Sequence, residues 1–387
     1  MLATTVAMIE QFNKSNIEIL NQMGFTVDVI GNLKKGNPIS QERLKNFEKW
    51  INEQGGEVIH YDATRNPFDL INNLQAVKKT VGLIKQKKYV FIHCHNPIGS
   101  VIGRLAAHIT KTPIIYTAHG FHFFKGANIV NWLLYYPVEK FLSRWTDALI
   151  LINKEDFCLA KKKFKAKNTL LIPGIGINLE NKQGLFKNKS EKREEIGVSP
   201  DSFVITTVCE LIKRKNVSAN IKALAHTKEK YPEEYKRIQM VICGKGPQKE
   251  DLEKMAKQLG IADHVKFLGF RTDVSEILKC SDAFLFMSFQ EGLPVALMEA
   301  MASRLPIICS DIRGNHDLID GKNGILIKLD KAYPVLVSQK IVEIMNNRAE
   351  QTEYGRKAHE SIYPYDTKIV SNQMKQIYAN LLICLPE

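Results

Sequence analysis

The feature that most constrains the fold is a regular alternation of short, continuously apolar runs with longer helical patterns. Runs such as Tyr89–His93, Pro113–Thr117 and Ala148–Ile152 do not alternate apolar with polar residues, as a strand with one solvated face would. Helical patterns such as Asp69–Lys87 separate them. Strands that are apolar on both sides are typical of a parallel sheet with helices on each face. The pattern therefore predicts an α/β fold.

The alternation is interrupted once, over Pro173–Pro200, where glycines, asparagines and charged residues gather. A chain of 387 residues is also too long for one ordinary core. We therefore expect two doubly wound, Rossmann-like domains that face each other across a cleft, with ligands at the carboxyl ends of the strands. The predicted parts are a first domain over 1–175, a linker over 176–200, a second domain over 201–365, and a final helix over 366–387 that packs back toward the first domain.

The start of the chain has a helical pattern followed by a short apolar run. Met8–Met23 carries apolar residues on one face and stops before Gly24, a residue that favours helix termination. The next run, Phe25–Ile30, has the composition of a strand. The sequence thus predicts one helix over 8–23 and one strand over 25–30.

The positive charge of the chain is unevenly distributed. Lys and Arg number 54 against 41 Asp and Glu, a net charge of +13, and residues 1–175 hold 23 of the former and 13 of the latter, a net of +10. A surplus of this size implies an acidic partner, such as nucleic acid, an anionic membrane or a phosphorylated substrate. Because no module with interleaved basic and aromatic residues is visible, we expect no nucleic-acid partner.

The cysteines and the hydropathy favour a cytoplasmic location. The seven cysteines are scattered and form no C-x-x-C, which is typical of free thiols in a reducing compartment. No segment reaches the roughly 18 uninterrupted apolar residues that a spanning helix needs. We expect a cytoplasmic protein associated peripherally with the inner face of the cell membrane.

The strongest motif is the segment Phe289–Ala302, which follows the apolar run Ala283–Met287. Pro294 suits the first turn of a helix, and such a helix start presents free backbone N–H groups to a phosphate or an oxyanion. Glu291 precedes this helix, and Glu299 lies about one turn inside it. One carboxylate can then bind a sugar hydroxyl and the other a pair of ribose hydroxyls. The alternative is that Glu291 caps the helix and Glu299 lies on a solvated face.

The E-x7-E spacing, with Gly292, Pro294 and Ala300 in register, resembles family 4 of the retaining nucleotide-sugar glycosyltransferases, which have the GT-B fold. The similarity runs nearly end to end and is greatest to the transferases that build bacterial capsules and exopolysaccharides. The other segments that carry the resemblance are Ile92–Pro97, Thr117–Gly126, Asn131–Lys140, Ile152–Asp156 and Ser310–Asn315.

The resemblance implies roles for individual residues. The implied catalytic residues are His119, which hydrogen-bonds the donor sugar, Glu291, and Lys215, which neutralises the departing diphosphate. His119 with His122 also has the H-x-x-H spacing of a metal pair, but no third ligand is evident. The implied donor-binding residues are Gly292, Leu293, Pro294, Val295, Glu299, Arg214, Gly244, Phe270 and Arg271.

Three of these positions carry alternatives. The family commonly has Gly-Arg where this chain has Cys209-Glu210, so Lys213 or Arg214 is expected to supply the second cation. Gly244 belongs to a G-x-G that lacks the third glycine of a dinucleotide fingerprint, and we interpret it as a tight strand-to-helix turn. Phe270 and Arg271 resemble a base-contacting position, or form a packed aromatic beside a surface arginine.

The chain contains no D-x-D, the pair with which metal-dependent glycosyltransferases hold a cation on the diphosphate. Lys215 and the helix N–H groups are expected to stabilise the diphosphate instead. The sequence therefore predicts no cofactor and no metal requirement, with a nucleoside-diphosphate sugar as co-substrate.

A possible membrane contact lies in Asn128–Trp145, which is rich in aromatic and aliphatic residues and precedes the lysines of Lys161–Lys167. Aromatics beside lysines suit attachment to anionic lipid. The alternative is that this segment packs against the first domain's sheet. Interfacial attachment is favoured because the acceptors of the resembling branch are polyprenyl-diphosphate-linked sugars.

The function implied is a retaining hexosyl- or N-acetylhexosaminyltransferase that uses a nucleoside-diphosphate sugar, with UDP-sugars the favoured donors. Its acceptor would be a polyprenyl-diphosphate-linked saccharide in capsule or exopolysaccharide synthesis, bound on the side of the basic first domain. A sugar-nucleotide epimerase with the same fold is one alternative, and a catalytically silent subunit that recruits a partner to the membrane is another. A nicotinamide oxidoreductase ranks last because the glycine fingerprint is missing.

Overall fold

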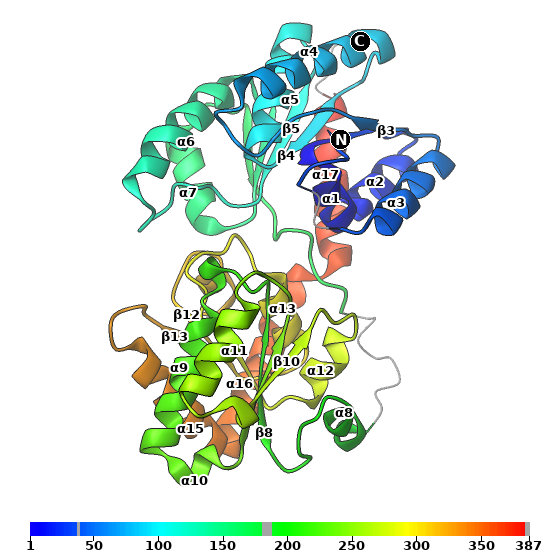
Figure 1. Cartoon of the computed structure of the whole chain (residues 1–387). Helices are drawn as coiled ribbons and strands as arrows, with labels where there is room; N and C mark the ends of the chain where they lie inside the picture. Colours follow the sequence, from blue (N-terminus) through cyan, green and yellow to red (C-terminus); the bar gives the residue numbers. More distant parts are fainter. Residues whose placement is uncertain (37–38, 180–187, 384–387) are drawn as a thin grey trace. The chain divides into compact units, whose positions relative to one another are not determined.

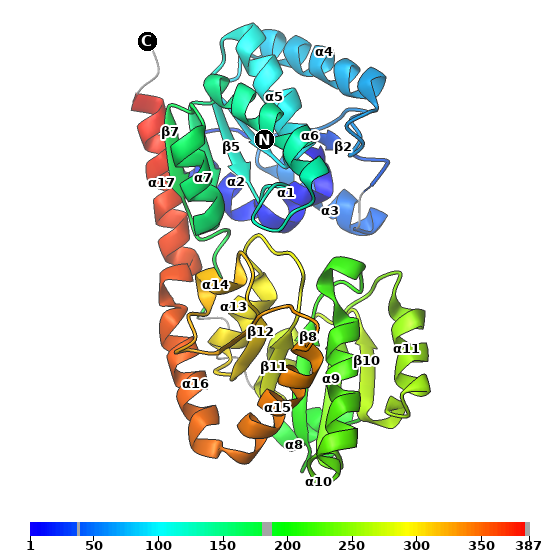
Figure 2. The same cartoon turned by 90° about the vertical axis from the view of Figure 1, so that its left-hand side faces the viewer.

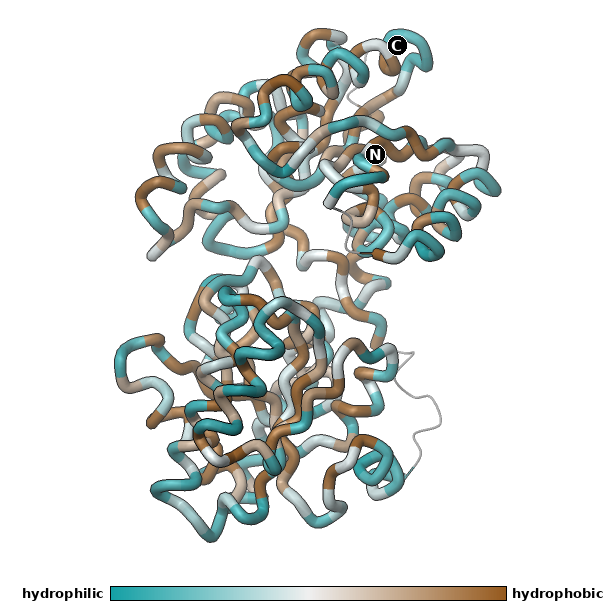
Figure 3. Tube along the Cα trace, viewed as in Figure 1, coloured by the Kyte–Doolittle hydropathy of each residue, from teal (hydrophilic) through white to brown (hydrophobic). Residues whose placement is uncertain are grey.

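The computed structural model describes residues 1–36, 39–179 and 188–383. These residues form two compact units, Met1–Gly176 with Thr367–Glu387, and Ile177–Asp366. Each unit is built on a parallel β-sheet with helices on both faces (Figure 1). The hydrophobic stretches coloured brown in Figure 3 run along the strands of both sheets.

The first unit contains a seven-stranded sheet in the order β3-β2-β1-β4-β5-β6-β7, and every pairing in it is parallel. The direction in which strands are added reverses between β1 and β4, which makes this point the topological switch. The strands are β1 (Leu2–Thr5), β2 (Val29–Asn32), β3 (Val58–His60), β4 (Ile92–His95), β5 (Ile114–Ala118), β6 (Ala148–Leu151) and β7 (Asn168–Leu171), and the helices are α1 (Val6–Phe12), α2 (Lys14–Gln22), α3 (Gln41–Glu53), α4 (Leu70–Lys87), α5 (Pro97–Thr110), α6 (Ile129–Leu142), α7 (Lys154–Lys163) and α17 (Thr367–Ile383).

Alternate residues of each strand pack into two separate hydrophobic layers. Ile92 and Cys94 of β4 contact the layer formed with α4, α5 and α7. Residues of the opposite face, such as Ile115 of β5, contact the layer formed with α1, α2, α3 and α17. Burial on both faces explains why these strands read as continuous apolar runs in the sequence.

The beginning of the chain differs from the prediction. The single helix expected over 8–23 is two helices that meet at Asn13, whose side chain accepts a hydrogen bond from Asn16 (2.9 Å). The strand expected over 25–30 is β2 at Val29–Asn32, because only from Val29 onward does the chain pair with β1 and β3.

Helix α5 was not predicted from the sequence. Seven of its fourteen residues are buried, including Ile102 and Ala106. Its buried face includes the small residues Gly99, Ser100 and Gly103, and glycine disfavours the interior of a helix.

The final helix, α17, belongs to the first unit and lies against α2 (red in Figure 2). Its buried residues are Val370, Met374, Tyr378 and Leu381, which are three or four positions apart and therefore share one face of the helix. This stripe packs into the same hydrophobic layer as α1, α2 and α3.

The second unit contains a six-stranded parallel sheet in the order β10-β9-β8-β11-β12-β13, with its switch point between β8 and β11. Helices α9 and α15 lie side by side on one face (Figure 2). The strands are β8 (Phe203–Val208), β9 (Ile238–Cys243), β10 (Val265–Gly269), β11 (Ala283–Phe286), β12 (Ile307–Ser310) and β13 (Ile325–Ile327), and the helices are α8 (Lys189–Glu195), α9 (Val217–Lys230), α10 (Pro232–Tyr235), α11 (Lys249–Gln258), α12 (Val274–Cys280), α13 (Val295–Ala302), α14 (Asn315–Leu318), α15 (Tyr333–Asn346) and α16 (Arg348–Ser361).

Part of the predicted linker is built into the second unit. Helix α8 packs against α12, and its buried Arg193 donates to the backbone carbonyls of Cys280 (2.9 Å) and Ser202 (2.8 Å) and pairs with Asp282. Residues 189–200 are therefore part of this unit's packing instead of a free connection. The stretch 180–187 of the predicted linker lies outside the described residues.

Helix α6 is attached to the first unit by a buried ion pair. Arg104 of α5 donates to Glu139 of α6 (2.8 Å), Tyr116 of β5 donates to the same carboxylate (3.2 Å), and Arg104 and Glu139 are at most 5% exposed. Removing one member leaves a charge buried without its partner, which costs about 3–5 kcal/mol.

We therefore expect Glu139→Ala to lower the free energy of unfolding by about 3 kcal/mol or more, measured by urea denaturation. The matched control is Glu360→Ala, which breaks an exposed pair with Arg356 (2.6 Å) and should leave the unfolding midpoint nearly unchanged. Equal midpoints for the two variants would contradict this role of Glu139.

The structure also bears on two predictions, the absence of a membrane-spanning helix and the state of the cysteines. Among the described residues, no helix combines the length and the hydropathy that crossing a membrane requires. The six cysteines in the described part of the chain are free thiols, and Cys384 lies outside it.

Candidate active site

The switch point of the second unit brings Lys215 and Glu291 together. Lys215 ends a 3-10 turn, Lys213–Lys215, that follows β8, and Glu291 lies between β11 and α13. Lys215 Nζ is 2.6 Å from Glu291 Oε1, and the side chains are 12% and 6% exposed. A largely desolvated ion pair at a switch point is a suitable place for a charged ligand.

Backbone contacts fix the geometry of this pair. Asn216 adopts a left-handed conformation (φ 50°) and its side-chain amide donates to the carbonyl of Met287 (2.9 Å). The amide of Phe289 donates to the carbonyl of Arg214 (2.8 Å). The loop after β8 and the loop after β11 are thus bound to each other on both sides of Lys215.

Arg214 is the second cation at this site. Its guanidinium lies 3.9 Å from Glu291 Oε2 and 3.6 Å from Glu210 Oε2. Glu210 therefore pairs with Arg214 beside Glu291. Of the two candidates considered from the sequence, Lys213 and Arg214, Arg214 is the one that the structure brings near Glu291, although both side chains are exposed.

The motif that follows Glu291 forms the predicted helix start. Pro294 is the residue before α13, with φ −79° and ψ 116°, so the first helical residue is Val295, one position later than expected. Gly292 and Leu293 form the turn into the helix, and Glu299 lies inside it, partly exposed. The first amides of α13, which form the positive end of the helix dipole, follow shortly after Glu291 in the chain.

A segment whose role the sequence did not reveal braces this loop. Ser310 donates its hydroxyl to the carbonyl of Ser288 (2.6 Å), and buried Arg313 donates to the carbonyl of Glu291 (3.2 Å). Asn315 in turn donates to the carbonyl of Ser310 (2.9 Å). The only available signal was that Ser310–Asn315 belongs to the resembling motifs.

Gly314 packs closely against the backbone of Glu291 and Gly292. Its φ is +84°, and a Cβ atom there would lie 2.6 Å from the carbonyl oxygen of Gly292. Gly321 has the same φ of +84°, but its added Cβ would meet nothing within 4 Å. The two glycines therefore separate the effect of the close approach from the effect of the backbone conformation.

We expect Gly314→Ala to weaken donor binding at least tenfold, because the Cβ must displace the Glu291–Gly292 backbone by several tenths of an ångström or more. Gly321→Ala should show only a loss of stability from the strained backbone. Isothermal titration with the expected donor, a UDP-sugar, compares the affinities of the two variants, and equal affinities would show that the close approach does not matter for binding.

Gly244 also sits at a close approach. It follows β9 with φ +152°, and a Cβ atom would lie 1.8 Å from the carbonyl oxygen of Cys209. Leu211 donates its amide to the carbonyl of Lys245 (2.9 Å), so the loops after β8 and β9 run side by side. This is the tight strand-to-helix turn predicted from the sequence.

Phe270 and Arg271 follow β10 and have different surroundings. The ring of Phe270 is 61% exposed, with Lys245 Nζ 5.9 Å from its centre. Arg271 pairs with Asp273 (2.5 Å) and Glu195 (2.9 Å). This hydrogen bonding holds the pKa of Asp273 well below its usual range. The ring of Phe270 is thus accessible to a ligand, whereas the guanidinium of Arg271 is already paired with two carboxylates.

His119 lies in the first unit, directly after β5 and therefore next to the strand that borders the switch point. His119 Nε2 is 3.3 Å from His95 Nδ1 of β4. Burial lowers the pKa of His119 to about 4. The imidazole is therefore neutral at physiological pH and can exchange hydrogen bonds with a sugar without adding charge.

Two carboxylates whose role was not predicted from the sequence anchor the loop after His119. Asp156 accepts a hydrogen bond from the amide of Phe121 (2.9 Å), and Glu155 accepts one from the amide of Lys125 (2.7 Å). Both carboxylates lie in the first turn of α7, within the resembling segment Ile152–Asp156. Their role is therefore to hold the His119 loop in place.

His122 does not join His119 in a metal site. Its ring packs at 4.7 Å from the ring of Tyr135 on α6. Within the described ranges, no three His, Cys, Asp or Glu side chains are grouped so that they could hold a metal ion.

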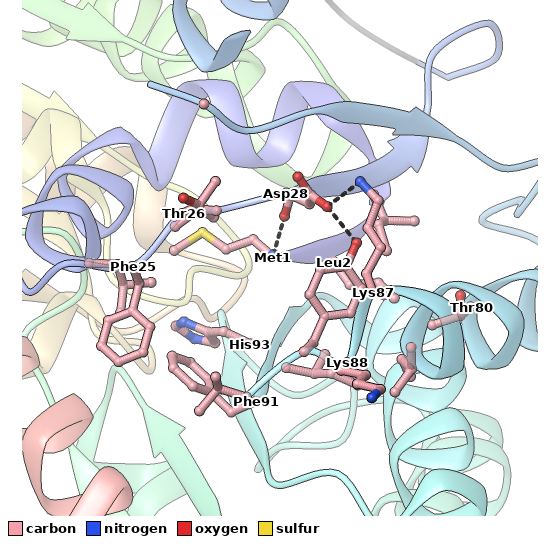
Figure 4. Close-up of a pocket in the computed structure, with 18 of the residues that line it drawn as sticks. Met1, Leu2, Phe25, Thr26, Asp28, Thr80, Lys87, Lys88, Phe91 and His93 are labelled. Carbon is pink, nitrogen blue, oxygen red and sulfur yellow. Dashed lines mark hydrogen bonds and ion pairs between the residues drawn. The ribbon is translucent and has the colours of Figure 1, made fainter. Parts of the chain in front are cut away.

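A pocket of about 490 Å³ opens at the amino-terminal edge of the first unit's sheet (Figure 4). Met1 and Leu2 at the start of β1, Asp28 before β2 and Phe91 before β4 line it, and Lys87 pairs with Asp28 (2.7 Å). Ligands of open α/β sheets bind at the carboxyl ends of the strands, which is the opposite edge. The pocket therefore lies at the edge opposite to the one that carries His119.

Comparison with known proteins identifies the family of the chain. Residues 188–361 match the family model of the glycosyl transferases group 1, and residues 7–153 match that of the glycosyl transferase 4-like proteins. The glycosyltransferase EpsD of Bacillus subtilis is 34% identical over 356 residues, which cover 86% of this chain and 91% of EpsD. The chain belongs to the group 1 glycosyltransferases.

Two further similarities extend this assignment. This glycosyltransferase is 31% identical, over 72% of its own length and 74% of the relative, to the UDP-Gal:alpha-D-GlcNAc-diphosphoundecaprenol alpha-1,3-galactosyltransferase of Escherichia coli. Its fold matches that of HepE from Anabaena in complex with UDP and glucose, with a TM-score of 0.74, 19% identity and 95% of each chain covered. The fold is GT-B, as predicted.

Proposed function

We propose that this glycosyltransferase moves a hexose or N-acetylhexosamine, with retention of configuration, from a UDP-sugar to a polyprenyl-diphosphate-linked saccharide in capsule or exopolysaccharide synthesis. The observation that carries the proposal is the Lys215–Glu291 pair at the second unit's switch point, next to the start of α13. The names of the E. coli relative and of the Anabaena structure, which mention a diphosphoundecaprenol acceptor and UDP, support this choice of substrates.

The donor diphosphate would be bound by Lys215, Arg214 and the first amides of α13. As the bond between the sugar and the diphosphate breaks, negative charge grows on the leaving oxygen, and fixed cations and N–H groups stabilise it. Lys215 can serve this purpose because its position is already fixed by Glu291. Two cations and a helix start perform the task that a bound metal performs elsewhere, so we propose that no metal is required.

The sugar and the nucleoside would be bound by the remaining residues. Glu291 would accept a hydrogen bond from a sugar hydroxyl, His119 would bind another hydroxyl, and Glu299 would accept bonds from the ribose. Phe270 offers an exposed ring to the base. In the transfer step the acceptor hydroxyl forms the new bond to the anomeric carbon on the face that the diphosphate leaves, and its proton passes to the leaving diphosphate oxygen.

The outward side of α6 is suited to the membrane in which such an acceptor resides. Ile129, Leu133 and Phe141 are 67%, 71% and 50% exposed and recur at four-residue or eight-residue spacing on one side of the helix. Lys140 and Arg144 are exposed beside them. Trp132, Tyr135 and Tyr136 pack inward instead and contact the core of the first unit. The packing alternative thus applies to the inner side of α6, and the membrane contact stays a proposal for its outer side.

We propose that this side of α6 binds anionic bilayers, with the aliphatic side chains in the headgroup region and the cations near lipid phosphates. The double variant Leu133→Glu/Phe141→Glu is expected to lower binding to vesicles of phosphatidylglycerol and phosphatidylcholine at least tenfold in a sedimentation assay. The matched control is Leu259→Glu, an exposed leucine of the second unit. Binding that both variants retain, or that the wild type lacks at physiological salt, would refute this contact.

The donor and the metal requirement can be tested directly. Nucleoside-diphosphate sugars are screened by thermal shift, and a donor at 100 times its Kd should add roughly 2.7 kcal/mol of stability. Transfer is then measured with and without EDTA, and we expect equal rates. Conversion of the donor to an epimer without any acceptor would show that the protein is an epimerase. Donor binding without turnover on lipid-linked acceptors would show that it is a catalytically silent subunit.

A further inference from the structure

Two histidines and a tyrosine form a continuous buried column behind His119. The rings of His93 and His95, two positions apart on β4, lie 4.2 Å apart, and His95 Nδ1 is 3.3 Å from His119 Nε2. At the other end, His93 Nδ1 is 2.9 Å from the hydroxyl of Tyr378 on α17, a residue 285 positions away in the sequence. His93 and His95 are at most 1% exposed.

The partners of His95 indicate where its proton lies. The pair His95 Nδ1 and His119 Nε2 needs one N–H and one lone pair, since both rings are neutral at physiological pH. His95 Nε2 is buried and has no hydrogen-bond partner in the described part of the chain. A buried N–H without a partner is less tolerable than a buried lone pair. The proton of His95 therefore belongs on Nδ1, from which it is donated to His119 Nε2.

This assignment determines what His119 offers to a substrate. With Nε2 accepting from His95, the single proton of neutral His119 is on Nδ1. Nδ1 has no hydrogen bond to the described residues, so its N–H is left for a ligand oxygen. His119 in this form donates a hydrogen bond to a sugar hydroxyl and cannot accept a proton from it through that nitrogen.

The far end of the column keeps His95 in place. His93 Nε2 is 2.8 Å from the hydroxyl of Thr117, so both of its ring nitrogens have partners and the ring cannot flip without losing them. Figure 4 shows His93 beside Phe91 at the pocket on the amino-terminal edge. The column thus extends from that edge to His119, with α17 closing its side.

We propose that His95 is a positioning residue for His119, that it sets the Nδ1–H tautomer of His119, and that His93 and Tyr378 of α17 hold it in register. The tautomer itself does not depend on the proposed function. Its consequence, a fixed N–H donor for the sugar, rests on the proposed role of His119 in donor binding.

The tautomer is measured by long-range ¹H–¹⁵N correlation spectra of ¹⁵N-histidine-labelled protein at pH 7, with signals assigned through His119→Gln and His95→Asn. We expect His119 and His95 each to show a protonated Nδ1 and an unprotonated Nε2. A protonated Nε2 on His119, or an imidazolium at either position, would overturn the proposal, whatever the activity of the enzyme.

Variants test the positioning role. His95→Leu removes the donor and should give His119 a mixed tautomer and lower kcat about tenfold or more, whereas His95→Asn supplies an N–H near the place of Nδ1 and should restore most of the rate. Tyr378→Phe should alter the signals of His93. The matched control Tyr61→Phe removes another buried hydroxyl of this unit, which donates to the carbonyl of Ala3 (2.8 Å), and should alter none of them.

The tautomer of His119 and its role in sugar transfer can be refuted separately. If His119→Ala leaves transfer intact while the spectra show the Nδ1–H form, the column is real and the proposed role of His119 is wrong. If His119→Ala abolishes transfer while His119 is protonated on Nε2, the function stands and the column does not set the tautomer. A His95→Leu rate equal to that of the wild type would also refute the positioning role.

Discussion

Lys215→Ala will lower the turnover number of sugar transfer by about 10²–10³-fold, with a smaller effect on donor binding. We expect this loss because Lys215 is a fixed cation, held 2.6 Å from Glu291, and in the proposed mechanism its largest effect comes when charge grows on the leaving diphosphate. Steady-state kinetics with the lipid-linked acceptor give kcat and KM separately.

The neighbouring lysine provides the control. Lys213 lies in the same 3-10 turn but is exposed, so Lys213→Ala should leave kcat within about twofold of the wild-type value. Because Lys215 and Glu291 contact each other, the losses in Lys215→Ala, Glu291→Gln and the double variant should not add. Full transfer by Lys215→Ala, or equal losses in the two lysine variants, would remove Lys215 from the active site.

Mild acid will destabilise the first unit far more than the second. Burial lowers the pKa of His93 to about 3 and that of His119 to about 4, and it holds the pKa of His95 well below its usual value. In the unfolded chain each histidine has a pKa near 6.5. Below that pH the unfolded state binds protons that the native state does not, so stability is present at neutral pH and is lost as the pH falls.

From pH 7.5 to pH 5.0 the loss should be about 2 kcal/mol for each of the fully buried His93 and His95, and less for partly exposed His119. Ordinary carboxylates stay ionised in this range and contribute little. The chain's three tryptophans, Trp50, Trp132 and Trp145, all lie in the first unit, so their fluorescence during urea unfolding reports on that unit alone.

The variant His93→Gln should flatten this pH dependence, whereas His226→Gln on α9 of the second unit should not change the tryptophan transition. A urea midpoint that is the same at pH 5.0 and pH 7.5 in the wild type would show that the three histidines are not buried as neutral groups.

Much of the fold could be predicted because both units bury their strands on two faces, and this burial is visible as continuous apolar runs. The same reasoning failed where a helix contains residues that disfavour helices, or where the pairing is distant. Helix α5 carries Gly99 and Gly103 on its buried face, and glycine lowers helix propensity. The strand β2 begins four residues later than its apolar run, because its limits depend on where β1 and β3 lie.

The candidate site shows the same division. Glu291 and Lys215 could be proposed because each belongs to a local motif directly after a strand. The residues that hold the site in place could not be predicted, since their contacts join segments that are far apart in the sequence. Arg313 reaches the backbone of Glu291 from the loop after β12, and Tyr378 meets His93 across 285 positions. No spacing in the sequence reports such pairs.

We propose that this chain transfers a sugar from a UDP-linked donor to a lipid-linked saccharide with retention. The most direct test incubates the purified enzyme with an active UDP-sugar and a polyprenyl-diphosphate-linked saccharide, in EDTA, and follows both substrates by NMR. We expect release of UDP together with a new glycosidic bond that has the anomeric configuration of the donor. A product of inverted configuration, or bound donor with no UDP released for any lipid-linked acceptor, would contradict it.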